Sequence, residues 1–537
     1  MEKLLIILFY LLFIYYYVHA SISNINYKPK GNNPLLYEPG TDPIIHLDAD
    51  TFVDTVLRPD KEKAYLVEFY KDWCGYCRRF MPWYKVLAEA VKTWPFVQVA
   101  AINCADAYNV KICRANDIPT VPKLKYFSRN ATSFADGQVI EHSYNSAIEM
   151  RQRLHAKLLD EFDKEMEKGN SNYYLGNYNM RGDVNSPNYA VHHFQLLQKV
   201  FMLQHSHMLK RGKTEPLMAE SITDSTLPKL HELINPLMEQ INQTEQAEAH
   251  AKKPIHVLDC TKNPERCKQL FYVSESDMLK AIHAALLDEV ISSGGNELDS
   301  QRISNLKKFL DLLIQRFPRK TFERSLPPTH PKSLSVGKPL SWSLKAIQVF
   351  NRMRQFLDKN EIITMDDWKN EFDAAKAENS EPFPIQAEWE HCKGSKPIFR
   401  GFTCGLWTAF HAMTVQAYLN NEQESLKPLK AIQAWVSSFF SCSGCRRHFM
   451  SMTTEKFPMD ERNVKTREDI VGYLWKAHNT VNARLHGDEA TEDPQFPKEQ
   501  FPPSFLCPEC RDSKGELEQE RTLDFLLQFS TNIKPRQ

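Results

Sequence analysis

The sequence is poor in glycine and carries no net charge. Its 537 residues include 18 glycines against 31 prolines, which indicates helices joined by stiff linkers rather than glycine-rich phosphate loops. Lys+Arg and Asp+Glu both number 67, so no excess charge favours a nucleic-acid partner or an anionic membrane. No stretch after residue 20 is apolar enough to span a bilayer, and no retrieval signal closes the chain. At about 100–200 residues per domain, the length predicts three to five domains.

The first twenty residues have the pattern of a signal peptide. Lys3 precedes an almost unbroken apolar run from Leu4 to Val18, and small or apolar residues stand at Val18 and Ala20. The alternative is a membrane anchor, but the run is shorter than the about 20 residues that a spanning helix needs. We therefore expect cleavage of residues 1–20 and a mature chain without a transmembrane anchor, in the ER or Golgi lumen or outside the cell.

Glycosylation sequons support this location weakly. Asn130 and Asn242 each begin an N-x-T triplet, which predicts glycosylated surface loops in a secreted chain. The tripeptide Arg181-Gly182-Asp183 matches an integrin-type motif, for which chance occurrence is the better interpretation.

The twelve cysteines fall into consecutive pairs with none left over. Their number fits an oxidising compartment, and local pairing is the simplest hypothesis because short loops close at the least entropic cost. Sequence alone does not fix the connectivity. The pairs are Cys74/Cys77, Cys104/Cys113, Cys260/Cys267, Cys392/Cys404, Cys442/Cys445 and Cys507/Cys510.

Near the N-terminus, a C-x-x-C motif lies between a buried-strand pattern and a helical pattern. The strand is expected at 64–70 (AYLVEFY), the motif W-C-G-Y-C follows at 73–77, and an amphipathic helix runs from 78 to about 93. This context places Cys74 near a helix N-terminus, where the macrodipole and free N–H groups stabilise a thiolate. A plain disulfide or half of a zinc site is the alternative.

Residues 42–150 resemble a thioredoxin-fold domain of the protein disulfide isomerase kind. The resemblance implies that Cys74 is the nucleophile and Cys77 the resolving thiol, and that Glu68 relays a proton to Cys77. It also implies a cis-proline facing the site, for which Pro119 and Pro122 are the candidates; Pro122 is the better one, because residues 123–127 continue as the following strand. Tyr76 departs from the histidine usual in such oxidants and removes one cation that would favour the thiolate.

The middle of the chain carries weaker signals. Residues 151–275 fit a degenerate thioredoxin-like region without active cysteines, and residues 276–384 fit a helical spacer. In the spacer, Leu306, Phe309, Leu310, Leu313 and Phe317 form one apolar helix face. The prolines that follow break this helical pattern: Pro327, Pro328 and Pro331.

Residues 385–512 carry three motifs in order. They read R-G-F-T-C-G-L-W-T-A-F-H at 400–411, C-S-G-C-R-R-H-F at 442–449 and W-K-A-H-N-T-V-N-A-R-L at 475–485. On the last helix, one face combines a Trp, a His and two Asn, which suits neither a solvated face nor an apolar core. A planar ligand with polar edges would satisfy them: Trp475, His478, Asn479 and Asn482.

These motifs resemble the flavin-binding helical domain of the Erv/ALR sulfhydryl oxidases, and the thioredoxin-like domain upstream is the arrangement of a quiescin sulfhydryl oxidase. The resemblance implies that Cys445 is the flavin-proximal thiol, that Cys442 exchanges with the N-terminal module, and that residues 513–537 are a tail. It also implies that the four remaining cysteine pairs, at 104/113, 260/267, 392/404 and 507/510, are structural. Zinc held by Cys442/Cys445 with Cys507/Cys510 is the alternative, but the 61 intervening residues exceed a compact ribbon, so no metal is expected. The residues expected against FAD are Arg400, Trp407, His411, Gly444, His448, Trp475, His478, Asn479, Val481, Asn482, Lys498 and Phe501.

The sequence therefore predicts a multidomain α+β protein with an N-terminal thioredoxin fold, a degenerate thioredoxin-like and helical middle, and a C-terminal all-α FAD domain. The resemblance implies an FAD-dependent thiol oxidase that introduces disulfides into secreted proteins. Electrons would pass from the thiols of reduced secretory-pathway proteins through Cys74/Cys77 and Cys442/Cys445 to FAD and molecular oxygen, giving hydrogen peroxide. The rival hypotheses are a disulfide isomerase and a disulfide-stapled adhesion module.

Overall fold

The computed structural model describes residues 27–168 except 93, 95, 143 and 145, three short strands between 203 and 219, residues 258–324 except 261 and 294, and residues 334–537. Among the helices in these ranges, none is both long and apolar enough to cross a membrane. The expected signal peptide, Asn242, the tripeptide at 181–183, the three prolines at 327–331 and most of 151–275 lie outside the described residues. The short strands are β6 (Leu203–Gln204), β7 (His207–Leu209) and β8 (Pro216–Ala219).

The N-terminal module is a five-stranded sheet between helices, with the strand order β1-β3-β2-β4-β5. The first three strands in this order are parallel, and β4 and β5 join antiparallel. Six of the seven residues of β2 are buried, as expected for a central strand with both faces covered. The strands are β1 (Ile45–Leu47), β2 (Ala64–Tyr70), β3 (Val97–Asn103), β4 (Lys123–Phe127) and β5 (Gln138–Ile140).

Four α-helices and a 3-10 turn (Phe134–Asp136) complete the described part of this module. The predicted amphipathic helix is α3, and its buried face includes Phe80, Leu87 and Val91. Helix α5 packs against α3 and extends well past residue 150, the boundary expected from the sequence, because Leu154 and Leu158 bury their side chains there. The helices are α2 (Phe52–Val56), α3 (Gly75–Val91), α4 (Val110–Ala115) and α5 (Ala147–Glu167).

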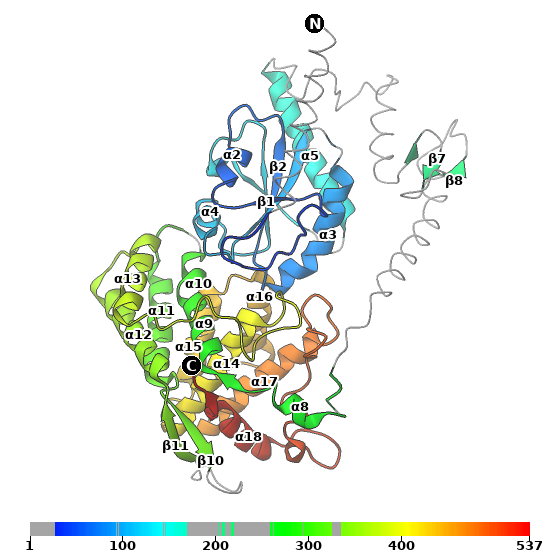
Figure 1. Cartoon of the computed structure of the whole chain (residues 1–537). Coiled ribbons are helices and arrows are strands. Elements are labelled where there is room, and N and C mark those ends of the chain that lie inside the picture. The colour runs from blue at the N-terminus through cyan, green and yellow to red at the C-terminus, as the bar shows by residue number, and fades with distance from the viewer. Residues whose placement is uncertain are drawn as a thin grey trace.

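The middle helices, expected to be a spacer, pack against the C-terminal module and share a core with it. The predicted apolar face of α11 is buried, and α11 packs against α12, α14 and α15. Figure 1 shows α11, α12 and α13 on the left of the lower half of the molecule. The elements are α8 (Pro264–Lys268), β9 (Val273–Ser274), α9 (Glu275–Leu286), α10 (Asp288–Ile291), α11 (Ser300–Arg316), β10 (Lys320–Arg324), β11 (Leu334–Pro339), α12 (Ser341–Lys359) and α13 (Met365–Glu378).

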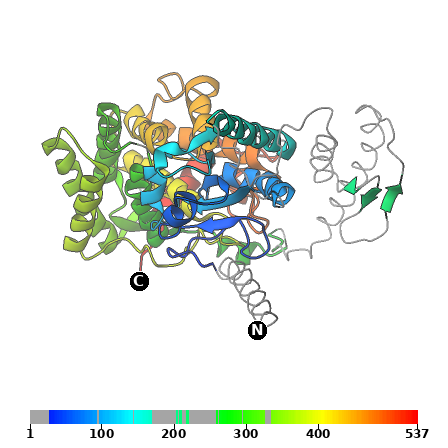
Figure 2. The ribbon, with the colours of Figure 1, turned by 90° about the horizontal axis from the view of Figure 1, so that it is seen from above.

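The C-terminal module is helical, as predicted. The N-terminal module rests on it, so that α3 lies above α16 in Figure 1, and the two modules overlap when seen from above (Figure 2). Its elements are α14 (Gly401–Leu419), α15 (Leu426–Phe439), α16 (Ser443–Ser451), the π-helical turn Met452–Lys456, α17 (Arg467–Leu485), the 3-10 turn Pro508–Cys510, α18 (Gln519–Thr531) and β12 (Ile533–Lys534). This arrangement confirms the predicted fold class.

The last 25 residues differ from the expected tail. Helix α18 packs against α14 and α17, and β12 pairs in parallel with β9. Leu526 and Leu527 are buried beside Val415, Val471 and Trp475, so burial of apolar surface holds this segment to the module.

Candidate functional site

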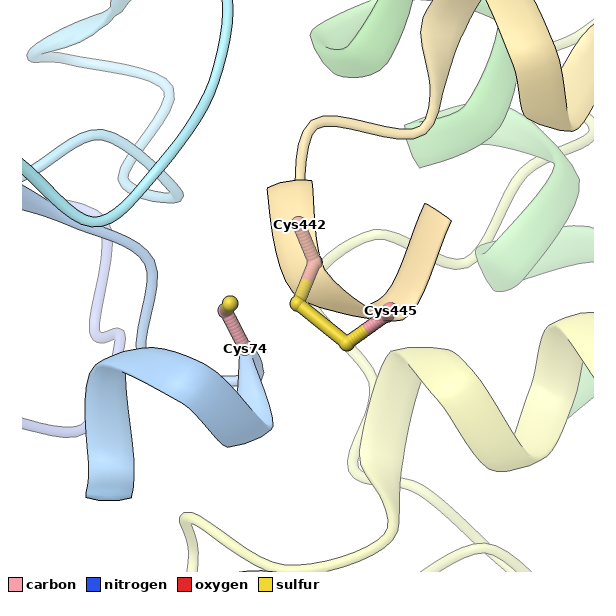
Figure 3. Close-up of side chains that lie close together, drawn as sticks. All are labelled: Cys74, Cys442 and Cys445. Atoms are coloured by element: carbon pink, nitrogen blue, oxygen red, sulfur yellow. A yellow bond between two sulfur atoms is a disulfide. The ribbon is translucent and has the colours of Figure 1, made fainter. Parts of the chain in front are cut away.

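Two redox-type cysteine pairs from opposite ends of the chain meet at the junction of the modules. Cys74 is the N-cap of α3 and Cys442 the N-cap of α16. The sulfur atoms of Cys74, Cys442 and Cys445 all lie within 4.8 Å of one another (Figure 3). Cys442 and Cys445 are joined in a disulfide, whereas Cys74 and Cys77 are buried free thiols. The arrangement is a dithiol facing a disulfide.

A backbone bridge fixes the register of this meeting. The Val121 amide donates to the Ser441 carbonyl at 3.0 Å, and the Ser443 amide donates to the Val121 carbonyl at 3.2 Å. The Val121-Pro122 peptide is cis, as the resemblance implied, and Cys74 Sγ lies 3.9 Å from the Val121 oxygen. The two hydrogen bonds flank Cys442 and hold it beside Cys74.

The environment separates the acidities of the two free thiols. Burial opposes ionisation of Cys74, but hydrogen bonds from the Cys77 thiol and from the amides of Cys77 and Tyr76, together with the Arg78 guanidinium, outweigh it and lower the pKa of Cys74. Burial and the neighbouring Cys74 raise the pKa of Cys77 well above its usual value. Cys74 is therefore the thiolate of the pair, and a thiolate is the attacking species in disulfide exchange.

Glu68 lies beneath the dithiol on β2. Its carboxylate is fully buried and accepts a hydrogen bond from the Tyr37 hydroxyl. Burial raises the pKa of Glu68 to about 8, and the charge on Cys74 acts in the same direction. A carboxyl group that titrates near neutral pH suits the proton-relay role expected of this residue.

Aromatic and ionic contacts seal the junction around the cysteines. The Trp73 ring lies 4.8 Å from the Phe402 ring and 5.3 Å from the Phe440 ring, centroid to centroid. Arg79 pairs with Asp488 through Nη2 and Oδ2 at 2.8 Å. These contacts exclude solvent from the space between the two pairs.

Gly444 has a different place from the one expected. It is not among the residues that line the cavity described below, and a Cβ built on it would overlap the Tyr76 ring. Tyr76 also stacks on His448 at 6.0 Å between ring centroids. The close approach of Tyr76 accounts for the glycine at this contact between the modules.

A cavity of about 880 Å³ begins behind the Cys442–Cys445 disulfide. Its size falls within the range of about 300–1,000 Å³ typical of cofactor pockets. Cys445 and three residues of the N-terminal module, Trp73, Gly75 and Arg78, form part of its wall. Eleven of the twelve residues expected against FAD also line it: Arg400, Trp407, His411, His448, Trp475, His478, Asn479, Val481, Asn482, Lys498 and Phe501.

Three rings from α14 and α17 form a flat stack in the cavity wall. Trp407 and His478 are parallel at 4.1 Å, and His411 Nε2 lies 3.0 Å from His478 Nδ1. Burial lowers the pKa of His411 to about 4 and that of His478 well below its usual value. Both imidazoles are therefore neutral at neutral pH, and they share one hydrogen bond.

Three side chains on the polar face of α17 hydrogen-bond to the backbone of the segment that follows the helix. The Trp475 indole and the Asn479 side-chain amide both donate to the Phe501 carbonyl, at 2.5 and 2.9 Å, and Asn479 Oδ1 accepts from the Phe501 amide at 2.8 Å. Asn482 donates to the Glu499 carbonyl at 3.2 Å. The chain segment 499–501 thus satisfies these side chains, which position the cavity wall.

Two cations, Arg400 and Lys498, also line the cavity. Burial lowers the pKa of Arg400 to about 10 and that of Lys498 to about 8. Arg400 lies over the Phe496 ring at 3.9 Å, while its Nε atom is buried and has no hydrogen-bond partner within the described part of the chain. A buried donor of this kind calls for an acceptor, and the cavity beside it would accommodate an anionic ligand. Flat rings, cations and an adjacent disulfide fit a flavin nucleotide.

The other cysteine pairs lie in disulfides of their own: Cys104–Cys113, Cys260–Cys267, Cys392–Cys404 and Cys507–Cys510. Cys507 therefore does not join Cys442 and Cys445 in a shared cluster, the arrangement that the zinc alternative required. Asn130 is exposed, as a glycosylated residue would need to be.

Sequence reasoning missed the residues that join the modules. Val121 acts through its backbone, which no side-chain motif reveals. The partners of Arg78 and Arg79 lie more than 300 residues away, at Ile398 and Asp488, beyond any local pattern. The only available signal for Arg78 was its position directly after Cys77.

The fold and the site together define a protein in which a thioredoxin-type dithiol module faces a helical module with its own C-x-x-C and a cofactor-sized cavity. Residues 43–149 match the thioredoxin family and residues 404–502 match the Erv1/Alr family. The chain is 30% identical to sulfhydryl oxidase 1 of Cavia porcellus, over 90% of this chain and 80% of that protein. The chain therefore belongs to the quiescin sulfhydryl oxidase family, which implies a flavin cofactor.

Other relatives match over a similar part of the chain. Sulfhydryl oxidase 1 of Gallus gallus is 29% identical over 91% of this chain, and that of Homo sapiens is 30% identical over 91%. The chain spans 66% of the length of each of these two relatives. A solved sulfhydryl oxidase fragment from human is 30% identical and covers 49% of this chain and 98% of its own, with a TM-score of 0.40.

Proposed function

We propose that this protein is an FAD-linked thiol oxidase that introduces disulfide bonds into proteins of the secretory pathway. The observation that carries the proposal is the placement of the Cys74 sulfur within 4.8 Å of the Cys442–Cys445 disulfide, which borders the cavity. Membership of the sulfhydryl oxidase family supports the reaction class. The five disulfides in the described part of the chain support an oxidising compartment.

The first half of the reaction takes place on the N-terminal module. A substrate thiolate attacks the Cys74–Cys77 disulfide at Cys74 and displaces Cys77 as a thiol, with Glu68 relaying the proton. The second substrate thiol then attacks the mixed disulfide, so the substrate leaves with a disulfide and Cys74/Cys77 are reduced. The low pKa of Cys74 makes it the better leaving group.

The second half of the reaction takes place in the arrangement seen here. The Cys74 thiolate attacks Cys442, the Cys442–Cys445 bond breaks, and Cys445 departs as a thiolate toward the cavity. Cys77 then attacks Cys74, which restores the Cys74–Cys77 disulfide and leaves Cys442 and Cys445 as thiols. One electron pair and two protons have moved from the first pair to the second.

The residues that line the cavity would hold the cofactor next to the Cys442–Cys445 pair. Arg400 and Lys498 would face its phosphates, and the rings of Trp407, His411 and His478 would lie against its flat parts. An FAD bound there supplies a two-electron acceptor that passes electrons to oxygen, so that two thiols and O₂ give a disulfide and H₂O₂. The remaining lining residues, from α16, α17 and the segment after it, would complete the pocket: His448, Trp475, Asn479, Val481, Asn482 and Phe501.

The first test is an absorption spectrum of the purified protein. A flavin band near about 450 nm that bleaches with a dithiol and returns in air is expected, because the cofactor carries the redox step. A colourless protein with no releasable FAD would contradict the proposal and favour a disulfide isomerase.

The relay has a separate test in Cys74→Ser. This variant should lose oxidation of reduced protein substrates while keeping slow turnover of a small dithiol, which reaches Cys442 directly when the modules separate. Oxygen consumption with a reduced unfolded protein and with dithiothreitol measures both activities. Equal loss of the two would contradict a two-module relay.

A further inference from the structure

A buried ion pair outside the two dithiols joins the modules. Lys71 Nζ on the N-terminal module contacts Glu289 Oε1 on α10, and each side chain is 1% exposed. The second oxygen of Glu289 accepts hydrogen bonds from the amide and the hydroxyl of Ser441, both at 2.9 Å. Lys71 stands three residues before Cys74, and Ser441 stands directly before Cys442. The Glu289 carboxylate therefore holds two chain segments, the one just before Cys74 and the one just before Cys442.

Solvent-excluding contacts surround this pair. The Lys71 ammonium also lies 5.6 Å from the Trp73 ring, which packs against Phe402 and Phe440. Taking two charges out of water costs several kcal/mol for each ion, and only good pairing offsets that cost. Removal of one partner therefore leaves the other buried charge without its directly bonded counterion in the docked state.

The same removal has little consequence once the modules separate. Lys71 would then be free to face water, while Glu289 would still be able to accept hydrogen bonds from Ser441, because both of these residues lie in the helical part of the chain. A single substitution thus acts selectively on docking, in contrast to the general loss of stability that an ion pair within one module would produce.

We propose that Glu289 is a positioning residue for the disulfide exchange between Cys74 and Cys442. Its carboxylate holds Ser441 in place through two hydrogen bonds and draws Lys71 to the same point through charge. The Val121 bridge sets the register of the two segments, and Glu289 holds them together. This inference rests on the proposed relay and adds the group that positions its central step.

The test measures docking without the cofactor reaction. Full-length protein carrying Cys77→Ser and Cys445→Ser retains Cys74 and Cys442, which form one disulfide when oxidised glutathione accepts two electrons and yields two reduced glutathione molecules. Mass analysis after acid quenching, across glutathione buffers of known ratio, gives the equilibrium constant for this bond. Glu289→Gln, Lys71→Met and the double substitution are compared in this background.

Each single substitution should lower this constant by about 100-fold, because it strands a buried charge in the docked state. The double substitution should return it to within about tenfold of the parent, because a neutral pair carries no such penalty. Lys71→Met provides the result independently if Glu289→Gln folds poorly, since the two residues lie in different modules. Glu422→Gln is the matched control: its partner Arg316 lies in the same helical part, so the constant should not change.

Unchanged constants in the single substitutions, or a double substitution no better than the singles, would overturn the positioning role while leaving the relay intact. A parent protein that forms no bond between Cys74 and Cys442 in any buffer would overturn the relay itself and the positioning role with it.

Discussion

At the scale of single residues, burial sets the chemistry of the N-terminal site. Glu68 and the two thiols lie in one solvent-free space, and their charges oppose one another there. The Cys74 thiolate is stabilised by donors at the start of α3, so the resolving thiol and the carboxyl group beneath it keep their protons. This division of roles needs no charged residue at position 76, where a tyrosine stands.

The raised pKa of Glu68 predicts a pH-dependent stability. Between the ordinary value of 4.5 and about 8, the folded protein keeps a proton that the unfolded chain releases, so the free energy of unfolding falls as the pH rises through this window. Glu68→Gln should flatten this decline, which amounts to at most about 1.4 kcal/mol per pH unit for one group. Urea denaturation of the reduced protein from pH 5 to 8 measures it.

The control for this prediction is Glu62→Gln. Glu62 is exposed, just before the same strand, so this substitution should keep the parent's dependence on pH. A parent slope that survives in Glu68→Gln would show that another group causes the decline.

At the scale of elements, the N-termini of α3 and α16 meet with almost no spare space. The Tyr76 ring occupies the position where a side chain at residue 444 would begin. The two C-x-x-C motifs are therefore matched in shape as well as in chemistry, with the bulky residue on one side and the glycine on the other.

Gly444→Ala should slow oxidation of a reduced protein substrate by about 5- to 100-fold, because overpacking costs roughly 1–3 kcal/mol. Adding Tyr76→Ala should recover most of the loss by vacating the space. Gly472→Ala on α17, where a new Cβ meets nothing within 4 Å, is the control and should match the parent. A double substitution as slow as Gly444→Ala would argue against a steric cause.

Helix α18 gives a second prediction at this scale. Leu526 is 3% exposed and packs beside Val415, Val471 and Trp475, so Leu526→Ala should lower the free energy of unfolding by about 2–5 kcal/mol. Urea denaturation followed by tryptophan fluorescence measures it. Leu344→Ala, at a position that is 40% exposed, should have little effect. Equal stabilities of the two variants would mean that α18 contributes little to this core.

Many of the helices and strands, and most of the residues that line the cavity, could be predicted from the sequence. The helices α3 and α11 were predicted from periodic apolar residues, and α14 and α17 from the spacing of their motifs. Such patterns arise within a turn or two of helix, so they can be recognised in the sequence, and these helices are present in the structure. The last 25 residues could not be assigned, because their apolar positions have meaning only beside Val415 and Val471. The hydrogen bonds between Asn479 and the Phe501 backbone were not predicted either, because the sequence shows that a side chain is polar but does not show its partner.

At the scale of the whole molecule, the described conformation is one of docked modules. Cys74 and Cys442 are both fully buried, so no substrate protein can reach either sulfur in this state. The contacts between modules had no sequence signature, because their partners are separated by hundreds of residues. In the proposed reaction, the modules would separate to admit substrate and dock to pass electrons.

The Arg79–Asp488 pair should tune this docking in a salt-dependent way. Both side chains are partly exposed, at 30% and 21%, so their attraction is modest and screened by salt. Arg79→Ala should slow protein-thiol oxidation by about two- to fivefold in dilute buffer, with a smaller difference at about 1 M salt. Steady-state oxygen consumption at both salt concentrations measures this.

Lys92→Ala is the control for this prediction, because Lys92 is the exposed C-cap of the same helix and pairs with Glu89 of its own module. It should behave as the parent at both salt concentrations. A defect in Arg79→Ala that is equally large at high salt would mean that the side chain acts by packing instead of charge.

The backbone bridge at Val121 has a consequence for how client proteins are chosen. Its amide and carbonyl are the groups that an incoming cysteine segment would use to align beside Cys74, and residues 441–443 occupy both. Under the proposed function, a client would therefore compete with this segment of the same chain, an internal rival that is always present at the same concentration. An extended, unfolded segment can imitate that rival, whereas a cysteine within a helix cannot. The enzyme would thus recognise an unfolded client through the conformation of its backbone and would depend little on the client's sequence.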